Sequence, residues 1–166
     1  MTTAELPFKQ PLVMIFFAHQ GDVLSSAIES ITHGPACHAG WLRSDQKTVA
    51  ELYYPKGRNR PLVNAEKPGI ELFTLEGMTP DLAAKFERFF DLLNVTGLDQ
   101  DYSVTGLFRF LFNSTPPDEQ SVFCSEYVMQ GIRKNAPELL PLARCEDYQV
   151  SPVDLYRSPR LHAIDW

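Results

Sequence analysis

The sequence has few cysteines, a deficit of basic residues and no long apolar run. Its three cysteines are an odd number without a Cys-x-x-Cys spacing, which argues against a disulfide framework. The net charge of −6 argues against a nucleic-acid partner and against an anionic membrane surface. The longest apolar run, Leu12–Ala18, is too short to span a bilayer and lacks the features of a signal peptide, so a cytoplasmic protein without integral membrane association is expected.

What is present indicates a single domain, 1–166, of the α+β class, with a small antiparallel sheet packed on helices. Apolar runs and period-2 patterns predict strands at Leu12–Phe17, His38–Arg43, Thr48–Tyr54 and Ile70–Leu75. Helical spacing and helix-start signals predict helices at Val23–Thr32, Pro80–Leu93, Ser103–Phe112 and Ser121–Lys134, and one beginning at Ser151. Residues rich in Pro, Gly and Asn predict loops at Pro55–Pro68 and Asn113–Gln120.

Cys124 is the first candidate for chemistry, because the predicted helix at Ser121–Lys134 places it in a first helical turn. Free N–H groups and the positive end of the helix dipole favour a thiolate there. The same N–H groups could stabilise an oxyanion on a carbonyl that the sulfur attacks. A single cysteine is more often a buried apolar residue without a chemical role. The functional argument for Cys124 therefore depends on its position at the helix start.

A thiolate nucleophile needs a base, and His38 opens a strand that a polar turn joins to the next strand. If Asp45-Gln46 is a two-residue turn, Gly40 pairs with Glu51, and His38 and Glu51 become diagonal neighbours on one face. A carboxylate in this place would fix the imidazole tautomer and stabilise the imidazolium. A register two residues tighter would place the two side chains directly opposite each other, whereas a shift by one residue would put them on opposite faces and exclude the assignment.

Four segments together resemble a known family pattern: Gly21-Asp22, Pro35–Leu42 with its His-Ala-Gly, Phe123–Val128 with its Phe-Cys-Ser-Glu, and Ser151–Leu155. The pattern is similar to that of the circularly permuted NlpC-type papain-like superfamily, the YaeF/YiiX-like proteins, in which the histidine strand precedes the cysteine helix. The resemblance covers residues 21 to 155. It implies a permuted papain-like fold.

The resemblance also implies roles: Cys124 matches the nucleophile, His38 the base and Glu51 the third polar residue. Asp101-Tyr102 resembles the family's Tyr-Asp region in reversed order, so Tyr102 is a candidate substrate or oxyanion contact and equally a packing aromatic. The implied activity is a cysteine hydrolase, amidase- or peptidase-like, that forms a thioacyl intermediate on an amide or ester bond of a peptide-like or lipid-like substrate. The alternatives are a lipid acyltransferase or phospholipase of the same fold, and a non-catalytic binding protein.

No cofactor is expected, and a metal site is the main chemical rival. The possible soft ligands are His33, Cys37, His38, Cys124 and Cys145. They form no zinc-binding motif, so no metal is predicted. Cys37 is expected to be structural, because neighbours on a strand point to opposite faces.

Overall fold

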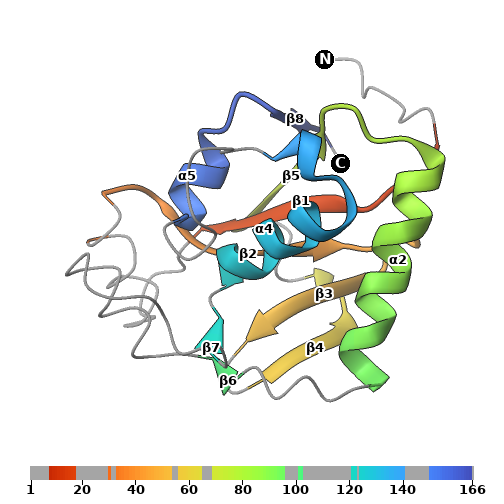
Figure 1. Cartoon of the computed structure of the whole chain (residues 1–166). Coiled ribbons are helices and arrows are strands. Elements are labelled where there is room, and N and C mark those ends of the chain that lie inside the picture. Colours follow the sequence, from red (N-terminus) through yellow and green to blue (C-terminus); the bar gives the residue numbers. More distant parts are fainter. Residues whose placement is uncertain are drawn as a thin grey trace.

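The computed structural model describes residues 8–17, 30, 33–53, 56–64, 69–95, 101–102, 121–122, 124–140 and 150–165, with the backbone alone at 53, 56, 93–95, 101–102 and 121–122. A six-stranded antiparallel sheet has the order β4-β3-β2-β1-β5-β8 (Figure 1). Its strands are β1 (Leu12–Phe17), β2 (Ala36–Leu42), β3 (Thr48–Tyr53), β4 (Lys56–Pro61), β5 (Ile70–Leu75) and β8 (Leu161–Ile164). A separate parallel pair joins β6 (Asp101–Tyr102) and β7 (Ser121–Val122).

The described helical elements are α2 (Pro80–Val95), α4 (Cys124–Asn135), α5 (Pro152–Tyr156) and a short 3-10 turn, η2 (Pro137–Leu139). In Figure 1, α4 and α5 lie over one face of the sheet and α2 runs along the side where β3 and β4 lie. The fold is therefore α+β with an antiparallel sheet, as the sequence predicts. The more specific interpretation, a permuted papain-like arrangement, stays a prediction.

The alternation along β1 divides the core in two. Val13 and Ile15 belong to the larger cluster, which also contains aromatic residues of α2 and α4. Leu12 and Met14 belong to a smaller cluster on the opposite face of the sheet. The smaller cluster also contains Leu42 of β2 and Val49 of β3. Both faces of the central strands are thus buried.

Helix α2 is fixed to the core by an aromatic stripe. Phe86 and Phe90 contact the ring of Trp41 on β2, with centroids 4.9 and 5.7 Å apart, and Phe89 stacks on Tyr127 of α4 at 5.6 Å. These rings recur at helical spacing, which places them on one face. The core position of α4, and with it the position of its first residue, depends on this packing.

The expected element boundaries need two corrections. The predicted loop at Pro55–Pro68 contains β4, which pairs with β3 along its whole length. The predicted helix start at Ser121 is wrong, because Ser121–Val122 is a short strand and the helix begins at Cys124. The remaining predicted strands and α2 are confirmed within one or two residues. The predicted helices at Val23–Thr32 and Ser103–Phe112 and the loop at Asn113–Gln120 fall almost entirely outside the described residues.

The C-terminal helix start is confirmed in detail. Asp154 N–H donates to Ser151 Oγ, and Ser151 N–H donates to the Asp154 carboxylate at 2.9 Å, which together form a capping box. Strand β8 follows α5 and was not predicted. Among the described helices, none is long and apolar enough to cross a bilayer.

Candidate functional site

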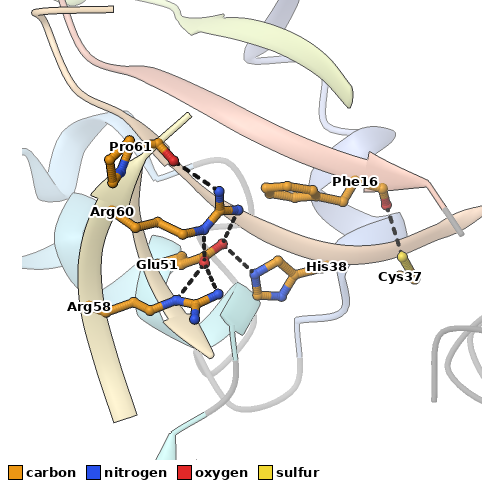
Figure 2. A network of polar contacts seen from close by, with 7 residues as sticks. All are labelled: Phe16, Cys37, His38, Glu51, Arg58, Arg60 and Pro61. Atoms are coloured by element: carbon orange, nitrogen blue, oxygen red, sulfur yellow. Dashed lines mark hydrogen bonds and ion pairs between the residues drawn. The ribbon is translucent and has the colours of Figure 1, made fainter. Parts of the chain in front are cut away.

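The hairpin of β2 and β3 has the register that the sequence predicts. Trp41 pairs with Ala50 and Leu42 with Val49, and continuing this register by one residue places Gly40 opposite Glu51. A Cβ atom built on Gly40 would lie 3.1 Å from Glu51 Cβ, which shows how closely the strands approach. His38 Nε2 lies 3.2 Å from Glu51 Oε2 (Figure 2). The expected pairing of the imidazole and the carboxylate is therefore present.

Glu51 is fully buried but not isolated. Its Oε1 accepts hydrogen bonds from Arg58 Nε and Nη2 at 2.9 and 2.8 Å and from Arg60 Nε at 2.6 Å (Figure 2). Burial alone raises the pKa of the carboxyl group, but His38, Arg60 and Arg58 outweigh burial and hold that pKa well below its ordinary value. Glu51 is thus a buried carboxylate that stays ionised.

The two arginines are site residues that the sequence interpretation missed. They lie in the segment predicted as a loop, where Arg58 pairs directly with Glu51 on β3 and Arg60 follows two residues later. Residues two apart on a strand share a face. The Arg-x-Arg spacing opposite an acid in an apolar strand is the signal that could have identified them.

His38 is mostly buried and its ring lies against Phe16 of β1, with centroids 4.9 Å apart. Burial lowers the pKa of His38, but the neighbouring Cys124 thiolate and the Glu51 carboxylate raise it to about 9. The imidazole is therefore held in its charged form at neutral pH. Because Nε2 faces Glu51, Nδ1 is the ring nitrogen left for the sulfur.

Cys124 is the first residue of α4 and is 1% exposed. Burial raises the pKa of its thiol, but the charge of His38, a hydrogen bond with His38, and the backbone N–H groups of Ala39 and Ser125 lower it below its ordinary value. The structure thus brings Cys124, His38 and Glu51 into one connected chain of polar contacts. It favours a thiolate beside an imidazolium.

The other predicted residues are placed less closely. The backbone of Tyr102 lies in β6, where it pairs with Val122, two residues before Cys124, and its side chain lies outside the described part of the chain. Cys37 is buried and its thiol donates to the Phe16 carbonyl at 3.4 Å, on the far side of His38 from Glu51 (Figure 2). This contact agrees with a structural Cys37. Cys145 lies outside the described residues.

Metal ligation by this cluster is opposed by its charges. In the described residues, no three His, Cys, Asp or Glu side chains come together in a way that could hold a metal ion. The carboxylate of the cluster already accepts from Arg58 and Arg60, and two guanidinium groups beside it repel a cation. The described side chains therefore do not fit a metal centre.

No protein-family model matches the sequence, and no curated protein matches it. A solved structure does match: metalloprotein yiiX from Escherichia coli O157:H7, with a TM-score of 0.66 over 94% of this chain and 96% of that chain, at 19% sequence identity. The chain shares the fold of yiiX. This supports the predicted likeness to YiiX-like proteins at the level of fold, while the wider permuted NlpC-type grouping stays a prediction.

Proposed function

We propose that this chain is a cysteine hydrolase with a permuted papain-like fold, in which Cys124 is the nucleophile, His38 the general acid and base, and Glu51 the residue that orients His38. The observation that carries the proposal is the convergence of these three side chains at the start of α4. Nucleophilic acyl chemistry requires a thiol beside an imidazole, and a third polar group on the other side of that imidazole.

In the first step, the Cys124 thiolate attacks the carbonyl carbon of an amide or ester, and a C–S bond forms. The C–N or C–O bond then breaks, and the leaving amine or alcohol takes the proton from His38 Nδ1. In the second step, neutral His38 takes a proton from a water molecule as the oxygen of that water attacks the carbonyl carbon of the thioester. The C–S bond breaks, the acid is released, and the thiolate–imidazolium pair is restored.

Backbone N–H groups at the beginning of α4 are the proposed oxyanion donors. Tyr102 remains a proposed substrate contact, because the backbone of β6 lies beside β7, just ahead of Cys124. The substrate is a peptide-like or lipid-like amide or ester. If an alcohol replaces water in the second step, the same site is a lipid acyltransferase, and a non-catalytic binding protein is the further alternative.

The test is capture of the intermediate. The chain is incubated with peptide amide, carboxylic ester and phospholipid libraries, and intact mass is measured after an acid quench. An acyl adduct is expected on Cys124 and absent in Cys124→Ala, whereas Cys37→Ala, a control at a second buried thiol of the described residues, should keep it. Turnover that survives in full in Cys124→Ala would refute the proposal.

Metal dependence provides a second discrimination, because yiiX is described as a metalloprotein. The proposed chemistry uses only this chain's side chains, so turnover should be unchanged after dialysis against EDTA. Loss of turnover with EDTA, recovered by a divalent metal, would favour a metal-dependent function instead.

A further inference from the structure

The two oxygens of Glu51 have different surroundings. Oε1 accepts three N–H groups from Arg58 and Arg60, whereas Oε2 lies 3.2 Å from His38 Nε2 and 3.4 Å from Arg60 Nη2. In Figure 2 the guanidinium groups of Arg60 and Arg58 lie on opposite sides of the carboxylate, and the imidazole approaches it from between them. The arginines therefore share the charge of Glu51 with His38.

Such sharing has a chemical consequence. A buried carboxylate that faced His38 alone would hold the imidazolium proton strongly, because little water screens the pair. A general acid must release its proton to the leaving group during each cycle. Two positive groups on the same carboxylate weaken its attraction for that proton, so Glu51 can orient the charged ring while the proton stays available for transfer to the leaving group.

We propose that Arg58 and Arg60 are positioning residues that act through Glu51: they hold its carboxylate in place and limit how strongly it retains the proton of His38. The inference deepens the proposed function and rests on it for its catalytic meaning. Among the described residues, the charged groups that face His38 include Glu51 from β3 and Cys124 from α4, and the two arginines of β4 contact the same carboxylate.

The expected size follows from the distances. Arg60 Nη2 and His38 Nε2 lie 3.4 and 3.2 Å from the same oxygen, Glu51 Oε2, so these two nitrogens are at most about 7 Å apart. At that separation a unit charge shifts a pKa by roughly one to two units at an effective dielectric constant of about 20. Arg60 is 17% exposed and Arg58 is 44% exposed, so water screens Arg58 more. Removal of Arg60 should therefore have the larger effect.

The experiment measures the pKa of His38 by ¹H–¹⁵N NMR titration in a Cys124→Ala background, where no thiolate contributes. Arg60→Met is expected to raise that pKa by about one unit, and Arg58→Gln by less. Arg60→Lys retains the charge and should restore the value to within a few tenths. If Arg60→Met does not fold, the more exposed Arg58→Gln serves as the test by itself.

Arg43→Met is the matched control. The side chain of Arg43 is 18% exposed, a fraction similar to that of Arg60. Arg43 is also ion-paired, but its partners are Glu87 and Asp91 of α2. It lies five residues beyond His38, about 16 Å along an extended strand. Its removal should leave the pKa of His38 unchanged, because this separation exceeds the screening length of about 8 Å at physiological salt.

An unchanged pKa of His38 in both arginine variants would show a purely structural role and overturn the inference. A lower pKa would also overturn it, since this would mean that the arginines strengthen the hold of Glu51 on the proton. Neither result bears on whether Cys124 is a nucleophile, because the titration uses no thiol. Conversely, absence of an acyl adduct on Cys124 would refute the proposed function and leave the titration result standing.

Discussion

Replacement of Glu51 by Gln removes the carboxylate that faces His38, Arg58 and Arg60. Because Glu51 is fully buried, its positive partners lose a charge that water does not replace at that point. Removal of one partner from a buried ion pair costs about 3–5 kcal/mol. Arg58 is 44% exposed and can turn to solvent, so we expect the lower end of this range, about 3 kcal/mol at pH 7.

The loss should depend on pH in a direction that the structure fixes. The pKa of Glu51 is lowered by folding, so its contribution to stability is present above the unfolded pKa and is lost as pH falls. Below an unfolded pKa of about 4.3, the difference between the two proteins should shrink by about 1.4 kcal/mol per pH unit. It should thus fall from about 3 kcal/mol at pH 7 to about 1 kcal/mol at pH 3.

His38 would add an opposite trend, because the wild type gains stability as pH falls from about 9, the pKa of His38, to the ordinary value of that pKa, and the variant lacks the carboxylate that helps to raise it. The comparison is therefore made with His38→Gln in both proteins. Urea unfolding is followed by circular dichroism at half-unit steps from pH 3 to pH 7, and the two free energies of unfolding are subtracted. Glu71→Gln, at an exposed acid of β5, is the control and should leave the curve unchanged.

A difference of about 3 kcal/mol that stays constant from pH 7 to pH 3 would refute the reasoning. It would mean that Glu51 contributes through packing and not through its charge. A difference near zero at every pH would show that the arginines and water replace the carboxylate completely.

Two further predictions concern the frame around the site. Gly40→Ala should lower the free energy of unfolding by about 1–3 kcal/mol in urea titrations. The reason is that the alanine Cβ would lie 3.1 Å from Glu51 Cβ and 3.3 Å from Ala50 O. A variant as stable as the wild type would show that β3 can shift. Ser151→Ala should lower it by about 1 kcal/mol by breaking the capping box with Asp154, and a melting temperature equal to that of the wild type would contradict this.

The sequence was sufficient where local physics decides the outcome. The register of β2 and β3 followed from a two-residue turn and the alternation of side chains, and it placed His38 beside Glu51. The capping box at Ser151 followed from a three-residue pattern. Both depend on residues close together in the chain, so no tertiary information was needed.

The sequence was insufficient where pairing across the fold overrides propensity. Lys56–Pro61 reads as a loop, because Gly, Asn and Pro are poor strand formers. It is a strand because β3 offers a complete row of partners and because Arg58 and Arg60 neutralise a buried acid. The start of α4 was placed too early for a related reason, since Ser121–Val122 pairs with Asp101–Tyr102, far away in the sequence.

Strand β4 is more than a charged edge of the sheet. Charged residues on an edge strand prevent its pairing with other chains. In β4 the side chains on the two faces also make different contacts. Arg58 and Arg60 contact Glu51 on one face, while Asn59 on the other face donates to the Phe90 carbonyl of α2 at 3.0 Å. The same helix packs through Phe89 on Tyr127 of α4. Strand β4, whose arginines contact Glu51, therefore also contacts α2, the helix that packs on α4. The positions of the acid and of the thiol thus depend on one connected structure.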